Sequence, residues 1–188
     1  LHVDTAYPSD GTVRITVDNA SDEAWTLSLR VPEWARGAGV RVWRDGSVTE
    51  DTAVDAGWAH VTRAFRAGDV VELDLPMAPR VVVPDPRIDA IRGCVAIERG
   101  PEVLALESVD LNSGDDVGEV VLDAAALPVE GDGRVWVQIA DRTPTAGGWP
   151  FGDGPAAPDA EPSRVALVPY HDWGNRGPST MRVWMPTA

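Results

Sequence analysis

The chain of 188 residues contains little cysteine, few basic residues and no long apolar run. Its single cysteine, Cys94, excludes an internal disulfide, and one thiolate cannot complete a tetrahedral metal site. Thirty acidic and 16 basic residues give a net charge of −14, which disfavours nucleic acid and anionic membranes because both carry the same sign. No apolar run approaches the roughly 20 residues of a membrane-spanning helix, and no signal peptide is recognisable.

Hydrophobic residues make up 44% of the chain, which is typical of a packed globular protein. The length allows one large β domain or two smaller ones. The chain begins at Leu1 and not at a methionine, so we expect a fragment or a processed form of a longer protein. The lack of a targeting signal therefore leaves the cellular compartment open.

Apolar and polar side chains alternate along much of the chain, whereas helical periodicity is nearly absent. A period of two sends one row of side chains inward and the other to water, which predicts half-buried strands. The clearest runs are residues 13–17, 25–31, 71–75 and 135–139. Asp-Gly pairs at 10–11, 45–46 and 132–133 offer glycine where a turn needs positive φ. These patterns predict an all-β protein built from antiparallel sandwiches.

The segment Pro84-Asp85-Pro86 is the predicted boundary between two modules. Two prolines in three residues stiffen the backbone and end strand pairing. We therefore expect a first β-sandwich module at residues 1–84 and a second at residues 85–188, each near the roughly 100 residues typical of such domains. One composite sandwich is the alternative. The Gly- and Pro-rich stretch 144–162 predicts a long surface loop.

Several motifs occur in a fixed order along the chain. Arg-Val-Pro-Glu-Trp-Ala stands at 30–35, and Arg-Gly-Cys-Val-Ala-Ile-Glu-Arg-Gly-Pro stands at 92–101. Near the end, residues 169–178 read Pro-Tyr-His-Asp-Trp-Gly-Asn-Arg-Gly-Pro, followed by Met-Arg-Val-Trp-Met-Pro at 181–186. Together they resemble the C-terminal, non-barrel part of glycoside hydrolase family 127, the β-L-arabinofuranosidase-like proteins. The resemblance implies that the chemistry belongs to a helical barrel upstream of this region.

No catalytic residue, metal or cofactor is assigned to this chain. The resemblance associates the family with a thiolate nucleophile and with zinc held by cysteines and a glutamate, and the motif for these ligands is not found here. A glycosidase needs two carboxylates about 5–10 Å apart. Glu98, Glu102 and Glu107 lie near predicted strands, but their spacing sets no pair apart. We expect Cys94 to be a small buried side chain in a strand.

Two further groups of polar residues are weighed against a structural role. The loop residues Asp110, Asn112, Asp115 and Asp116 offer oxygen ligands in an order that does not match an EF-hand. A solvated acidic loop is the expectation, with a calcium site as the alternative. His171 and Asp172 would point to opposite faces of a strand, so we expect no catalytic dyad.

Eight tryptophans are the feature of the composition that favours binding, because sugar rings stack their C–H faces on flat aromatic side chains. Five are expected to fill cores: Trp25, Trp34, Trp58, Trp173 and Trp184. Three are candidates for a sugar platform or for contact with the missing barrel: Trp43 at a hairpin, Trp136 on the polar side of its strand and Trp149 in the long loop.

The sequence therefore predicts the non-catalytic rear of a family 127-like enzyme, which braces the catalytic barrel of the parent chain. By resemblance, the parent hydrolyses β-L-arabinofuranosides. Carbohydrate and a second copy of the chain are further candidate partners, and bracing requires an exposed apolar patch. A free-standing carbohydrate-binding module and a glycosidase in its own right are the two alternatives.

Overall fold

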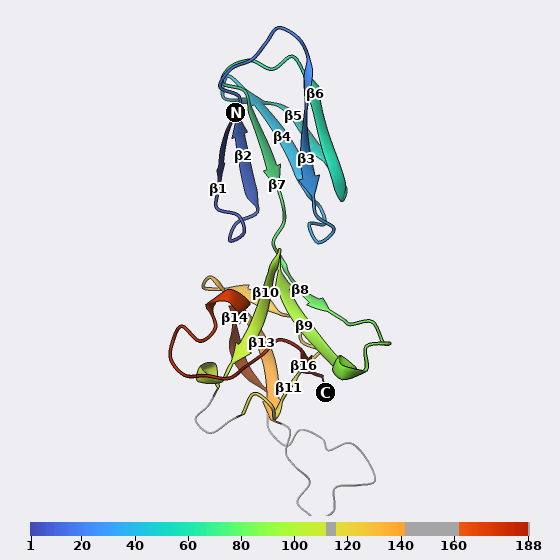
Figure 1. The fold of residues 1–188 in the computed structure, drawn as a ribbon, viewed down its shortest axis with the longest axis vertical. Coiled ribbons are helices and arrows are strands. Elements are labelled where there is room, and N and C mark those ends of the chain that lie inside the picture. Colours follow the sequence, from blue (N-terminus) through green and yellow to red (C-terminus); the bar gives the residue numbers. More distant parts are fainter. Residues whose placement is uncertain (112–115, 142–161, 188) are drawn as a thin grey trace, which may run out of the picture. The chain divides into compact units, whose positions relative to one another are not determined.

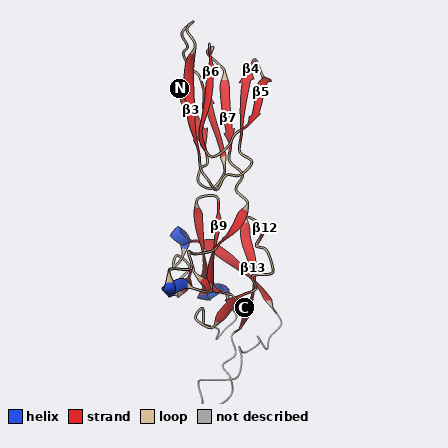
Figure 2. Cartoon of the chain, turned by 90° about the vertical axis from the view of Figure 1, so that its right-hand side faces the viewer, coloured by secondary structure: helices blue, strands red, loops and turns tan. Residues whose placement is uncertain are grey.

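The computed structural model describes residues 1–111, 116–141 and 162–187. Strands form most of the regular structure of these residues. Three short 3-10 turns accompany them (Figure 2): η1 (Asp89–Ile91), η2 (Ser108–Asp110) and η3 (Tyr170–Asp172). Every pair of named strands is antiparallel, which confirms the predicted all-β class. In the described part of the chain, no helix has the length and apolar character needed to cross a membrane.

The chain divides into two compact units, Leu1–Ala78 and Pro79–Ala188 (Figure 1). The sequence places the boundary a few residues later, at Pro84-Asp85-Pro86. The intervening strand β8 (Pro79–Val82) pairs with β9 (Cys94–Arg99) and so belongs to the second unit. The two prolines follow β8, where they end a strand inside the second unit.

The first unit is a sandwich of two sheets. The larger sheet has the order β1-β2-β7-β4-β5. Its strands are β1 (His2–Thr5), β2 (Thr12–Thr16), β4 (Gly39–Arg44), β5 (Ser47–Ala53) and β7 (Val70–Asp74). The smaller sheet pairs β3 (Trp25–Val31) with β6 (Gly57–Arg63) along seven residues. Apolar rows from both sheets form one core, in which Val31 of the small sheet and Val42 and Val71 of the large sheet are wholly buried.

The second unit surrounds its core with one sheet. The strand order is β11-β13-β14-β10-β9-β16, with β12 beside β13, β15 beside β10 and β8 beside β9. The strands not yet bounded are β10 (Glu102–Glu107), β11 (Val120–Leu122), β12 (Val129–Gly131), β13 (Arg134–Asp141), β14 (Ser163–Pro169), β15 (Met181–Arg182) and β16 (Met185–Pro186). A parallel bridge between Leu122 and Thr187 joins the two ends of this order, so the sheet curls around a core that includes Ile97, Leu106 and Met185.

Two of the three Asp-Gly turns have the predicted backbone. Asp45 and Gly46 have φ of 51° and 76°, and Asp132 and Gly133 have φ of 53° and 71°. Gly11 is required for a different reason, because a Cβ atom there would lie 1.9 Å from the carbonyl oxygen of Leu75. The close approach of two backbones, and not a positive φ, selects glycine at this turn.

Candidate functional site

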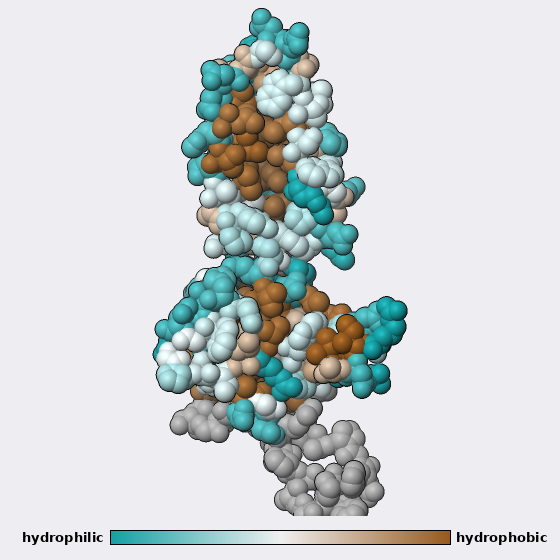
Figure 3. Space-filling view, in the orientation of Figure 1, coloured by the Kyte–Doolittle hydropathy of each residue, from teal (hydrophilic) through white to brown (hydrophobic). Residues whose placement is uncertain are grey.

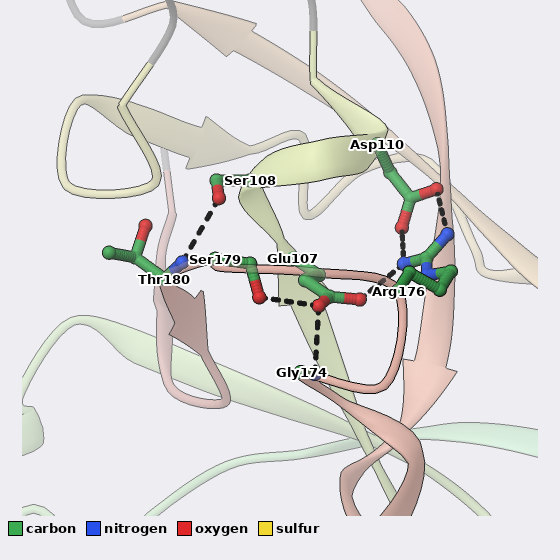
Figure 4. A network of polar contacts seen from close by, with 7 residues as sticks. All are labelled: Glu107, Ser108, Asp110, Gly174, Arg176, Ser179 and Thr180. Atoms are coloured by element: carbon green, nitrogen blue, oxygen red, sulfur yellow. Dashed lines mark hydrogen bonds and ion pairs between the residues drawn. The ribbon is translucent and has the colours of Figure 1, made fainter.

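A wholly buried carboxylate organises the main polar network of the second unit. Glu107, the last residue of β10, is 0% exposed. Its Oε1 atom accepts hydrogen bonds from Ser179 Oγ at 2.6 Å and from the backbone N–H of Gly174 at 2.9 Å. Its Oε2 atom accepts a hydrogen bond from the guanidinium of Arg176 (Figure 4). All three donors belong to the segment 170–180, which we call the tail loop, so one side chain of β10 holds this distant loop.

Contacts on both arms of the tail loop complete the network. Arg176 Nη1 donates to Asp110 Oδ1 at 2.7 Å, so the guanidinium lies between two carboxylates (Figure 4). Thr180 N donates to Ser108 Oγ at 3.0 Å, and Ser108 N donates to the Thr180 carbonyl at 2.9 Å. The loop residues 170–178 are exposed, yet their backbone is anchored from inside the unit.

Glu107 is held in its ionised form. Burial alone would raise the pKa of this carboxyl, but hydrogen bonds from Ser179, Arg176 and Gly174 outweigh it and lower the pKa to about 2. A general acid of a glycosidase needs the opposite shift, because it must keep a proton near neutral pH. The arrangement is therefore suited to holding a loop and not to donating a proton.

Asp69 has a similar role in the first unit. This side chain is 1% exposed and accepts two hydrogen bonds from Arg44, at 2.8 Å from Nε and at 2.5 Å from Nη2. It also accepts the backbone N–H of Arg66 at 2.9 Å. The hydrogen bonds from Arg44 are the main reason why the pKa of Asp69 is lowered to about 2. The carboxylate thus fixes the turn between β6 and β7 against the end of β4.

The three glutamates near β9 and β10 are each paired with a different arginine. Glu98 pairs with Arg80, Glu102 pairs with Arg99 at 3.5 Å, and Glu107 pairs with Arg176. Each of these three carboxylates therefore has a cationic partner of its own.

The calcium and dyad candidates are only partly within the described residues. Asp110 pairs with Arg176, and Asp116 Oδ1 accepts the N–H of Gly118 at 2.9 Å. The other two loop candidates, Asn112 and Asp115, lie outside the described residues. His171 and Asp172 stand in the exposed turn η3 and not in a strand. The distance from Nε2 to Oδ2 is 3.6 Å, too long for a hydrogen bond.

The described residues do not offer a zinc site. Among residues 1–111, 116–141 and 162–187, no group of three or more His, Cys, Asp or Glu side chains is placed to hold a metal ion. Cys94 begins β9 opposite Pro186 and is half-buried, where the sequence predicted a buried strand interior. Its position at the strand end leaves one side open. The zinc chemistry that the resemblance implies therefore has no donor set here.

The three candidate tryptophans differ in their surroundings. Trp43 is the last residue but one of β4, and its buried Nε1 atom has no hydrogen-bond partner among the described residues. Trp136 donates its Nε1–H to the Gly131 carbonyl at 3.1 Å, and the Arg164 guanidinium lies 4.6 Å from its ring centroid. One face of this ring is thus covered by a cation. Trp149 lies outside the described residues, and a binding role for the three stays a prediction.

Two tryptophans predicted to fill cores are exposed instead. Trp58 is 62% exposed and Trp173 is 38% exposed. In β6 the buried positions are Ala59 and Val61, so Trp58 belongs to the outward row of its strand. Trp173 follows η3 in the tail loop, outside any strand. The alternation along 57–63 already contained the signal for Trp58, but the size of its side chain suggested a core residue.

The fold is all-β, and its buried carboxylates belong to polar networks that hold turns and loops. Comparison with family models assigns both units. Residues 1–77 match the "Beta-L-arabinofuranosidase, GH127 middle domain", and residues 79–186 match the "Glycoside hydrolase family 127 C-terminal domain". The chain therefore belongs to glycoside hydrolase family 127.

Similar proteins are much longer than this chain. A non-reducing end β-L-arabinofuranosidase of Bifidobacterium longum subsp. longum is 31% identical over 95% of the chain and only 29% of its own length. The structure of a family 127 β-L-arabinofuranosidase from Geobacillus stearothermophilus T6 has a TM-score of 0.78 and 31% identity, covering 99% of the chain and 30% of that enzyme. Another glycoside hydrolase has a TM-score of 0.78 and 29% identity over 99% of the chain and 32% of its own length. The chain thus spans about a third of these relatives or less.

Proposed function

We propose that this chain is the non-catalytic β-rich region of a family 127 glycoside hydrolase, and that it braces a catalytic part of the parent protein. One observation carries the proposal: the chain is matched over 95% of its length but accounts for only 29% of the Bifidobacterium enzyme. The matched domains are the middle and C-terminal ones. Because that relative is a non-reducing end β-L-arabinofuranosidase, we expect the parent to act on non-reducing ends of β-L-arabinofuranosides.

The ionisation of the buried carboxylates supports a non-catalytic role. Both Glu107 and Asp69 have a pKa lowered to about 2, so neither retains a proton at neutral pH. Each carboxylate accepts hydrogen bonds from an arginine and from a backbone N–H group of its own unit. Their interactions stabilise turns and loops, which is what a scaffold requires.

On β1, the side of the sheet that faces the core is partly exposed, which supports the bracing role. Val3 pairs with Ile15 in register, so both side chains point to the core side of the large sheet. Ile15 is 6% exposed, whereas Val3 on the edge strand is 54% exposed. Figure 3 shows apolar side chains gathered on this face of the first unit. An apolar face left open in this way is suited to contact with another part of the parent.

The bracing proposal is tested in the parent protein. We expect that removal of residues 1–188 lowers both its thermal midpoint and its turnover of an aryl β-L-arabinofuranoside. Val3→Lys should lower the midpoint in the parent and leave the 188-residue chain unchanged, because only the parent covers that face. Val48→Lys is the matched control, since Val48 is also exposed on an edge strand, β5. A parent that keeps its midpoint and turnover without this region would refute bracing.

Association of two copies through this region stays a prediction. Light scattering of the purified chain over a range of concentrations measures it directly.

A further inference from the structure

The outer face of the small sheet in the first unit carries an exposed aromatic side chain among polar ones. In β3 and β6 the inward rows form the core. The outward rows consist of six exposed residues: Thr26, Ser28, Arg30, Trp58, His60 and Thr62. Trp58, at 62%, is the most exposed tryptophan of the described residues. We call this surface the Trp58 face.

The polar side chains of the Trp58 face are held in cross-strand pairs. Thr26 Oγ1 and Thr62 Oγ1 are 2.8 Å apart, and Ser28 Oγ and His60 Nδ1 are 2.9 Å apart. Each pair also shares a register position between β3 and β6. Hydroxyl and imidazole groups are therefore fixed in rows along the face, and less side-chain entropy is lost when a ligand binds them.

The third row places Trp58 directly opposite Arg30 in the register. The Arg30 guanidinium donates to the backbone carbonyls of Val31 and of Gly57, the latter at 3.2 Å. These bonds tie the cation to the end of the two strands. The Trp58 face thus presents the flat apolar ring of Trp58, with the hydrogen-bonding side chains of the other rows next to it.

We propose that the Trp58 face binds a neutral oligosaccharide, with Trp58 as the stacking platform. A sugar ring offers a C–H face to an indole ring and hydroxyl groups to side chains that both donate and accept. Ser28, His60 and Arg30 provide such donors and acceptors. This inference goes beyond the bracing role and does not depend on it.

The size of the face favours a small ligand over a protein. Seven residues of strand at about 3.4 Å and two strands, each about 4.8 Å wide, give roughly 230 Å². A stable protein interface needs about 800 Å² on each partner and a core of apolar side chains. One aromatic ring surrounded by Thr, Ser and His does not provide that core.

The charge of the protein favours a neutral glycan over an acidic one. The chain has a net charge of −14, which repels a polyuronate at low salt. The outward rows themselves contain one cation, Arg30, and no carboxylate. The ligand class is therefore a neutral saccharide chain.

The test is affinity electrophoresis of the 188-residue chain in native gels containing arabinan, arabinoxylan, a mixed-linkage glucan or polygalacturonate. We expect retardation by at least one neutral polysaccharide and none by polygalacturonate. Trp58→Ala should weaken binding by at least about ten-fold, and Trp58→Phe should restore most of it because a flat ring remains. His60→Ala should weaken binding less, since it removes one hydrogen-bonding group.

Trp173→Ala is the matched control, because Trp173 is the other exposed tryptophan among the described residues and belongs to the second unit. It should bind as the unchanged chain does. Urea unfolding should show equal midpoints for all variants at these exposed positions. The proposal is overturned if no neutral polysaccharide retards the chain, if Trp58→Ala binds normally, or if polygalacturonate alone is bound. None of these results bears on the bracing test in the parent.

Discussion

In each unit of this chain an almost wholly buried carboxylate accepts hydrogen bonds from an arginine, but the two carboxylates, Asp69 and Glu107, act over different sequence distances. In the first unit, Asp69 binds the N–H of Arg66, three residues away, and the side chain of Arg44. In the second unit, Glu107 binds Gly174, Arg176 and Ser179, which are 67 to 72 residues away. Asp69 fixes a local turn, whereas Glu107 joins the end of the chain to an interior strand.

The difference follows from how each unit closes its core. The first unit covers a five-stranded sheet with a two-stranded sheet. The second unit curls one sheet until β16 reaches β11, so the final segment must cross the unit. A buried ionic anchor at Glu107 gives that crossing one defined position, which apolar contacts alone specify less well.

Acid should produce the largest loss of stability, because it protonates both buried carboxylates, Asp69 and Glu107. The unfolded carboxyls bind protons near pH 4, while the folded ones have pKa values of about 2. Between these values the unfolded state binds more protons, so the free energy of unfolding is highest above this window and falls as the pH decreases through it. Urea midpoints at neutral pH and at about pH 3 measure the loss. In the double variant Asp69→Asn/Glu107→Gln, the urea midpoint should change less with pH than in the unchanged chain. An equal change in both proteins would contradict the assignment of the acid sensitivity to these two carboxylates.

Glu107→Gln should be the most destabilising single substitution. It leaves Arg176, which is 36% exposed, without its buried partner, and we expect a loss of about 3 kcal/mol in the free energy of unfolding. Amide hydrogen exchange at Gly174 and Thr180 should increase as the tail loop is released. Glu130→Gln is the control, since Glu130 is 42% exposed in its pair with Arg99, and should cost only about 0.5 kcal/mol. Equal effects of the two substitutions would refute the role of Glu107.

Asp69→Asn should have a smaller effect, of about 2 kcal/mol, because the amide retains an oxygen that can still accept one hydrogen bond. Amide hydrogen exchange should increase at Arg66 and remain unchanged in the tail loop. Urea unfolding compares this variant with Asp51→Asn, which alters a 62% exposed partner of Arg41 and should be nearly neutral. If the tail loop also opened in Asp69→Asn, the two anchors would not be independent.

Trp136→Phe should have the smallest effect, about 1 kcal/mol, because it removes only the hydrogen bond to the Gly131 carbonyl. The phenyl ring can still pack beneath Arg164. Thermal or urea unfolding compares the stability of this variant with that of Trp58→Phe, in which the substituted ring is exposed. A larger loss in Trp58→Phe would show that the outer face of β3–β6 is part of the packing.

The strands were predictable because their signal is local. The run 25–31 alternates as its strand does, and the turns at 45–46 and 132–133 follow from Asp-Gly chemistry. The family motifs also indicated the correct family, as the matches over 1–77 and 79–186 show. These features can be predicted from residues close together in the sequence or from the order of the motifs.

The anchors were not predictable because their partners are distant. Nothing near Glu107 in sequence distinguishes it from Glu98 or Glu102, since its donors lie at the other end of the chain. Trp58 lies in a strand pattern, which suggested a core position, but the buried positions of β6 are Ala59 and Val61, and Trp58 belongs to the exposed row. The end of the first unit was placed at a proline pair, although pairing of β8 with β9 decides it.

We propose that this region of a family 127 protein has no activity of its own. Turnover of an aryl β-L-arabinofuranoside by the highly purified 188-residue chain, measured from mildly acidic to neutral pH, tests it most directly. We expect a rate equal to that of buffer. Turnover that disappears on substitution of a single carboxylate, in a variant that remains folded, would contradict it.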